Sequence, residues 1–98
     1  MQDFINTWSF SGELFYIKEL DGEFAASVKV RGISRRKDAM STQIAEMTCL
    51  METMVYDTLI EKKIDLYQKI VVTGHIETWV TEKKTKVLYI ADNIDKAE

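Results

Sequence analysis

Apolar and polar residues alternate along the first part of the chain. From Asn6 towards Lys18 the pattern has the period of a strand with one face buried. It places Trp8, Phe10, Gly12 and Leu14 on the inward face, and Thr7, Ser9, Ser11 and Glu13 on the outward face. Trp8 and Phe10 are therefore expected in the core, and Gly12 is expected at a bend or bulge.

A hairpin is predicted next, because Leu20–Glu23 contains Asp-Gly, a dipeptide typical of tight turns between strands. The following segment, Glu23–Arg31, alternates again. Its inward positions are Phe24, Ala26, Val28 and Val30, and its outward positions are Ala25, Ser27, Lys29 and Arg31. Gly32–Ser41 is polar and basic, which predicts a loop.

Residues 43–64 fit two patterns. Helical spacing connects Ile44, Met47, Met51, Met54 and Val55, which predicts one long helix. Alternation from Ala45 to Met51 instead predicts a strand, with a short helix from about Thr53 to Ile64. In this second pattern one strand face holds Ala45, Met47, Cys49 and Met51. Periodicity alone leaves both open, and either way the methionines are expected in core or subunit packing.

The last third predicts a strand over residues 69–80, a turn over 81–86 and a closing strand from Val87 to Ile94. With the strand-then-helix pattern for residues 43–64, the order of elements is that of an OB-fold, a five-stranded, partly open barrel. The fold class is then all-β with one short helix. Strongly bent strands close such a barrel, and mid-strand glycines allow bending, which accounts for Gly12 and Gly74 together.

The composition indicates one domain spanning residues 1–98, without proline or an evident linker. No apolar run approaches the ~20 residues of a membrane helix, and the first residues lack the pattern of a secretory signal. A single cysteine, Cys49, excludes an internal disulfide and favours a cytoplasmic protein. One histidine and one cysteine fall short of a metal site, and no nucleophile is matched with a base. We therefore expect no enzyme, metal or cofactor.

The net charge of −3, from 13 basic and 16 acidic residues, does not by itself indicate nucleic-acid binding. The basic residues are clustered, however, and a local patch can act alone because salt screens distant charges. Single-stranded nucleic acid is bound by basic grooves and aromatic stacking surfaces. The candidate binding residues are Lys29, Arg31, Arg35, Arg36, Lys37, His75, Trp79, Lys83, Lys84 and Lys86.

Each candidate also has a structural alternative. Trp79 shares the outward face of its strand with His75 and Glu77, where it is expected either to stack on a base or to pack in a subunit interface. The basic loop and the lysines of residues 83–86 are expected either to contact phosphates or to remain solvated. His75 is the only histidine and is expected at the surface, with or without a role in binding. Phe15 and Tyr16 are candidates for a supporting stacking role.

The segments "NTWSFSGEL", "IVVTGHI" and "YIADNI", with Cys49 in the third strand, resemble the bacterial single-stranded DNA-binding protein family in order and spacing. The resemblance covers nearly the whole chain. It implies an OB-fold with a strand followed by a helix in residues 43–64. It also implies binding of single-stranded DNA in replication, recombination or repair, by a homo-oligomer (a dimer or a tetramer) that contacts replication proteins.

Two departures from the family suggest an alternative. The aromatic residue at the end of the family's third strand falls near Met51 or Glu52 here. The sequence stops at "DNIDKAE", without the long Gly/Pro/Gln-rich tail of typical members, and in this it resembles the dimeric primosomal replication protein N subgroup. These departures and the acidic net charge favour, as the second hypothesis, a protein–protein interaction module with weak or no DNA binding.

Overall fold

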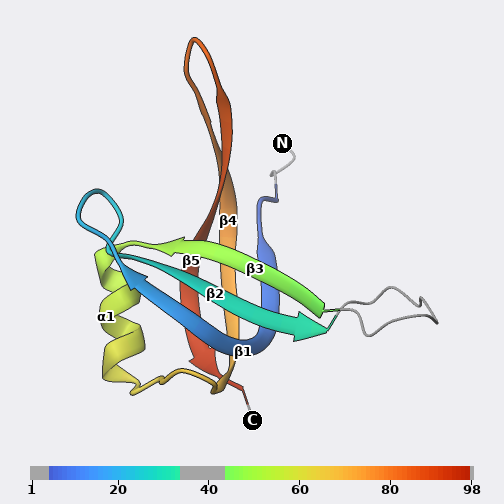
Figure 1. Ribbon diagram of the computed structural model, residues 1–98, viewed down its shortest axis with the longest axis vertical. Coiled ribbons are helices and arrows are strands. Elements are labelled where there is room, and N and C mark those ends of the chain that lie inside the picture. The colour runs from blue at the N-terminus through green and yellow to red at the C-terminus, as the bar shows by residue number, and fades with distance from the viewer. Residues whose placement is uncertain (1–4, 34–43, 98) are drawn as a thin grey trace, which may run out of the picture.

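The computed structural model of the protein describes residues 5–33 and 44–97. The elements are β1 (Trp8–Glu19), β2 (Ala26–Ile33), β3 (Ile44–Met51), α1 (Thr53–Glu61), β4 (Lys69–Val80) and β5 (Thr85–Lys96). The strands close into a barrel in the order β1-β2-β3-β5-β4 (Figure 1). The predicted five-stranded OB-fold barrel with one short helix is confirmed, and so is the strand-then-helix pattern after residue 43. Of the loop predicted over Gly32–Ser41, Gly32 and Ile33 instead form the end of β2, and the remaining residues lie outside the described part of the chain.

Strand β1 closes the barrel because it bends from one neighbour to the other. It pairs with β4 from Trp8 to Glu13, and with β2 from Glu13 to Glu19. Gly12 lies at this transition, where a Cβ atom would collide with the carbonyl oxygen of Arg31. The expected bend at Gly12 is therefore present. The bulge of β1 lies further along, at Phe15, where the register with β2 shifts by one residue.

The core fills the barrel with the inward side chains of all five strands. Fully buried side chains include Leu14, Val28, Val30, Met51, Ile70, Val72 and Ile94. The helix covers one end, since Leu59 is buried in the same cluster and Val55 and Tyr56 pack against it. Trp8 and Phe10 also pack against this core while remaining partly exposed. Their predicted inward orientation follows from the same alternation that buries Leu14.

Some details of the sequence-based prediction are wrong. Phe24 does not lie on the inward face of β2, which begins at Ala26; it belongs to the β1–β2 loop. The helix ends at Glu61 rather than Ile64, because Lys63 adopts a positive φ of 55° that turns the chain away. Met54 is 82% exposed on α1, so it is not a core residue, and its alternative role in subunit packing stays a prediction. The closing strand extends from Thr85 to Lys96, longer than predicted.

The hairpin of β4 and β5 extends beyond the body of the barrel (Figure 1). We call residues 76–89 the β4–β5 finger. One of its faces carries exposed apolar side chains, namely Ile76, Val80, Val87 and Tyr89. Among residues 5–33 and 44–97, no helix has the length and apolar character needed to cross a membrane.

Candidate nucleic-acid interface

Two aromatic rings stand side by side on the outer surface of β1, because of the bulge at Phe15. In a regular strand consecutive side chains point to opposite faces, but the extra residue of a bulge interrupts this alternation. Leu14 is buried, Ile17 packs against the core, and both Phe15 and Tyr16 between them face outward. Tyr16 is 42% exposed. The bulge therefore creates an aromatic surface that simple alternation does not predict.

Two cations of β2 cover these rings. The guanidinium carbon of Arg31 lies 4.3 Å from the centre of the Phe15 ring. The ammonium nitrogen of Lys29 lies 5.2 Å from the centre of the Tyr16 ring, its direct cross-strand neighbour. Both distances are within the range of cation–π attraction. We call Phe15, Tyr16, Lys29 and Arg31 the β1–β2 platform.

The charge of the β1–β2 platform is partly balanced by β3. A carboxylate oxygen of Glu46, the cross-strand neighbour of Arg31, lies 3.5 Å from its guanidinium group. Both side chains are about half exposed, so this ion pair is weak and readily exchanged for another anion. Lys29 instead faces the uncharged Thr48. The platform therefore offers two cations beside two π-faces, which are the chemical groups that hold a phosphate and a base.

Trp79 lies on the outward face of β4, as the alternation predicts, and it contacts the β1–β2 loop. Its ring stacks on Phe24 with 6.2 Å between the ring centres and 27° between the planes. Register places Trp79, Glu77 and His75 opposite Lys86, Leu88 and Ile90 on this face. Of these, Leu88 and Ile90 are buried. Trp79 keeps 41% of its surface exposed, so its role in stacking or in an interface stays a prediction.

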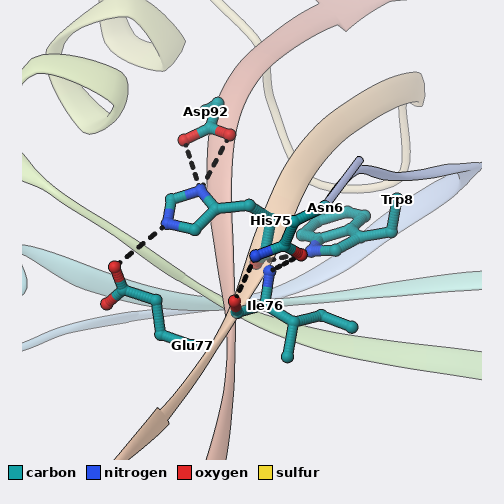
Figure 2. Close-up of polar contacts among 6 residues, drawn as sticks. All are labelled: Asn6, Trp8, His75, Ile76, Glu77 and Asp92. Atoms are coloured by element: carbon teal, nitrogen blue, oxygen red, sulfur yellow. Dashed lines mark hydrogen bonds and ion pairs between the residues drawn. The ribbon is translucent and has the colours of Figure 1, made fainter. Parts of the chain in front are cut away.

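His75 lies between two carboxylates at the base of the β4–β5 finger (Figure 2). Its Nδ1 is 2.9 Å from both oxygens of Asp92, and its Nε2 is 3.4 Å from an oxygen of Glu77. The hydrogen bond to Asp92 raises the pKa of His75 above its ordinary value, with a smaller opposing effect of burial. Asp92 reaches His75 because it is the extra residue of a second bulge, in β5. The two acids weaken any attraction of this region for phosphate.

The base of the β4–β5 finger is held by the N-terminal segment (Figure 2). The indole Nε1 of Trp8 donates a hydrogen bond to the carbonyl oxygen of His75 at 2.9 Å. Asn6 exchanges two hydrogen bonds with the backbone of Ile76, at 2.7 and 2.9 Å. A Cβ atom on Gly74 would collide with the carbonyl oxygen of Ile90 and lie 2.5 Å from the Trp8 ring. Gly74 therefore allows this close approach, in addition to the bending expected of it.

The predicted lysines of residues 83–86 are not brought together with the platform. Lys83, Lys84 and Lys86 are exposed at the far end of the β4–β5 finger, where Thr81 closes the turn by a 2.8 Å backbone hydrogen bond to Lys84. Arg35, Arg36 and Lys37 lie outside the described residues. Among the described residues, no group of three His, Cys, Asp or Glu side chains is arranged to hold a metal ion.

The sequence contained a signal for the aromatic surface that alternation alone missed. In "LFYI" the inward residues Leu14 and Ile17 are three positions apart, with two aromatic residues between them. Such spacing breaks the period of two and indicates a bulge within a strand. The contacts of Arg31 with Phe15 and of Trp79 with Phe24 had no local signal, because each connects separate strands or loops.

No protein-family model matches the chain, and no curated protein matches it significantly. Solved structures do resemble it. A mitochondrial single-stranded DNA-binding protein of S. cerevisiae, Rim1, is 12% identical with a TM-score of 0.67, covering 93% of both chains. A small single-stranded DNA-binding protein from Mycoplasma pneumoniae is 13% identical with a TM-score of 0.67, covering 95% of this chain and 94% of its own.

The dimeric N-terminal domain of PriB from Thermoanaerobacter tencongensis is also similar. It is 14% identical with a TM-score of 0.56, and the match covers 95% of this chain and 97% of that domain. At such low identity the likeness concerns the fold. The predicted resemblance is thereby confirmed at the level of the backbone, and the chain has the OB-fold of these DNA-binding proteins.

Proposed function

We propose that this protein binds single-stranded DNA, largely without regard to sequence and without catalysis. The observation that carries the proposal is the β1–β2 platform, in which Lys29 and Arg31 lie over two outward aromatic rings of an OB barrel. A base stacks on an exposed ring while the neighbouring cation turns to the phosphate that follows it. Every base has a π-face, so such contacts tolerate any sequence.

The binding surface is proposed to continue from the platform in two directions. Arg35, Arg36 and Lys37 follow β2 in the sequence and add cations for further phosphates. On the other side, Trp79 offers a half-exposed ring that Phe24 holds in place, with Lys83, Lys84 and Lys86 beyond it. His75 contributes least, because Asp92 and Glu77 surround it.

A homo-oligomer, a dimer or a tetramer, is proposed as the working form. Among the described strands, β1 pairs on one side only between Trp8 and Gly12, which leaves an edge for another strand. The exposed apolar face of the β4–β5 finger is a second surface that association would cover. The structural similarity to a dimeric PriB domain supports this proposal. A cytoplasmic role in replication, recombination or repair, with replication proteins as partners, stays a prediction from the resemblance.

Tryptophan fluorescence tests the proposed function. Titration of the protein with dT oligonucleotides should quench the emission of Trp79, and affinity should fall steeply as salt concentration rises. The Trp79→Phe variant should bind with little loss, because it keeps an aromatic ring, while the quenching decreases. Absence of binding to dT and to mixed single strands, at micromolar protein and low salt, would refute the function.

The second candidate is a protein–protein interaction module. It is favoured by the carboxylates of Glu77 and Asp92 around His75 and by the ion pair of Arg31 with Glu46, which both lower the positive potential of the surface. Affinity purification from the native cell after nuclease treatment separates the two functions. If the wild-type chain recovers a replication or recombination protein but does not bind single-stranded DNA, the protein–protein interaction module is favoured.

A further inference from the structure

A surface groove of about 630 Å³ lies beside the β1–β2 platform, at the bend of β1. Its volume falls within the range of about 300–1,000 Å³ that is usual for sites of small ligands. Its walls combine charged and apolar side chains from the ends of several strands. They include Glu13, Arg31, Gly32, Ile33, Ile44 and Lys69.

Glu13 occupies a position between two cations in this groove. It is the cross-strand neighbour of Arg31 on β2 and of Lys69 on β4, because β1 passes from one pairing to the other at this residue. Arg31 meanwhile contacts Phe15 and Glu46, and the carboxylate of Glu13 forms no ion pair with any other residue of the described part of the chain. Glu13 therefore places a hydrogen-bond acceptor in the wall of the groove, beside two groups that attract phosphate.

The apolar side of the groove is formed by Ile33 and Ile44, a direct cross-strand pair at the ends of β2 and β3. Ile33 is 88% exposed and Ile44 is 57% exposed. Two exposed isoleucines side by side give a flat aliphatic surface of the kind on which a base packs when it leaves the stack. The shared residue Arg31 makes the groove continuous with the β1–β2 platform.

We propose that this groove holds one nucleotide of the bound strand and prefers a base with an exocyclic amino group over thymine. The inference rests on the proposed function, and it adds a base-selective position to an otherwise sequence-tolerant surface. In the groove, the base packs on Ile33 and Ile44, and its amino group donates a hydrogen bond to Glu13. The flanking phosphates contact Lys69 and Arg31.

The selectivity follows from the chemistry of the base edges. Cytosine carries an N4 amino donor, and Glu or Asp is its usual protein acceptor. Thymine carries the O4 carbonyl oxygen in the same place, which would face the carboxylate of Glu13 with no proton between them. A desolvated acceptor without a donor weakens binding, so the groove disfavours thymine rather than merely preferring cytosine.

The test compares two variants that remove the same charge. Affinities for dC and dT oligonucleotides of equal length are measured at one salt concentration for Glu13→Gln and for Glu61→Gln. Glu61 is exposed at the end of α1 and does not line the groove. Both variants remove one negative charge, so both gain the same general electrostatic affinity for DNA. Comparing the dC-to-dT affinity ratio of one variant with that of the other therefore cancels this gain and the intrinsic difference in stacking between dC and dT.

The Glu13→Gln variant should lower the dC-to-dT affinity ratio about fivefold or more relative to Glu61→Gln, since one good base contact gives discrimination of this order. Lys69→Gln should instead weaken both strands equally. Thermal melting confirms that each variant is folded. Ratios that agree within about twofold between the two glutamate variants, while both bind DNA, would overturn this inference and leave the proposed function standing. Absence of binding to either strand by the wild-type chain would overturn both.

Discussion

Two β-bulges shape the outer surface of the barrel, and they have opposite chemical consequences. In β1 the bulge at Phe15 turns two aromatic residues outward, between the inward residues Leu14 and Ile17. In β5 the bulge at Asp92 turns two polar residues outward, between Ala91 and Ile94. The backbone device is the same in both strands.

The neighbours of each bulge decide what it does. The first lies beside Lys29 and Arg31, and therefore becomes a cationic and aromatic surface. The second lies beside His75 and Glu77, and therefore becomes an acidic surface that holds a histidine. We expect a polyanion to be attracted to the first region rather than to the second. A strand irregularity thus selects which side chains face outward, while cross-strand partners set the charge around them.

The largest expected effect concerns the packing at Gly74, next to the acidic surface around His75. Gly74→Ala should lower the free energy of unfolding by about 3 kcal/mol, because the added methyl group overlaps Trp8 and the backbone of Ile90. Urea denaturation measures this change. Gly22→Ala is the matched control, since nothing lies within 4 Å of its Cβ position, and it should change stability by less than about 0.5 kcal/mol. Equal stability of the two variants would contradict the close packing at Gly74.

The next effect tests the aromatic half of the β1–β2 platform. Tyr16→Ala should weaken binding of single-stranded DNA about tenfold, which corresponds to a stacking contribution of about 1.4 kcal/mol. Tyr16→Phe should bind like the wild-type chain, because it keeps the ring and loses only the hydroxyl group. If both variants bind equally well, stacking on Tyr16 is ruled out, and Phe15 and Trp79 remain as the candidate aromatic contacts.

A smaller effect tests the cationic half of the platform. Lys29→Gln should reduce the slope of log affinity against log salt concentration by about 0.7, the value for one phosphate contact on a single strand. Lys63→Gln carries the same charge change after α1, away from the platform, and should leave the slope unchanged. Slopes that fall equally in both variants would mean that overall charge, rather than the platform, determines binding.

The smallest effect concerns the acidic region and its pH dependence. Because Asp92 raises the pKa of His75 in the folded protein, the folded state binds this proton more tightly than the unfolded chain does. The resulting stabilisation is complete below the unfolded pKa of about 6.5 and is lost as pH rises through the folded pKa. For this exposed group it should remain below about 1 kcal/mol.

Chemical denaturation at pH 5.5 and at pH 8.5 measures this contribution. The wild-type chain should lose more stability between the two values than His75→Gln, whose side chain does not titrate. Asp92→Asn should behave like His75→Gln, since it removes the main partner of the histidine. A wild-type difference no larger than that of the two variants would show that this ion pair does not contribute in solution.

Much of the fold could be predicted from local patterns. Alternation identified β1, β2 and β4, and the Asp-Gly turn was placed correctly between the first two strands. The alternation from Ala45 to Met51 predicted β3, but only the resemblance favoured it over a long helix. Phe24 was misplaced because alternation does not reveal where a strand begins. Phe24 leaves the sheet to stack on Trp79, a contact between residues far apart in the chain.

The candidate site was predicted less completely. Lys29 and Arg31 were expected on the outer surface, since their strand is regular and each outward position follows from the period of two. Their pairing with Phe15 and Tyr16 was not expected, because it depends on the register between β1 and β2. For His75, the neighbour Glu77 follows from the alternation of its own strand, whereas Asp92 was not expected because it comes from the bulge of β5.

The sequence by itself determined β1, β2, β4 and β5 and most of the inward residues of the barrel, because these depend on residues close together in the chain. Only the tertiary structure decided which charged side chains lie beside which aromatic rings and where the groove lined by Glu13 forms. It also decided that the surface beside the bulge of β1 is cationic and the surface beside the bulge of β5 is acidic. Such contacts join separate strands at a particular register, and a shift of one residue would turn every side chain to the other face.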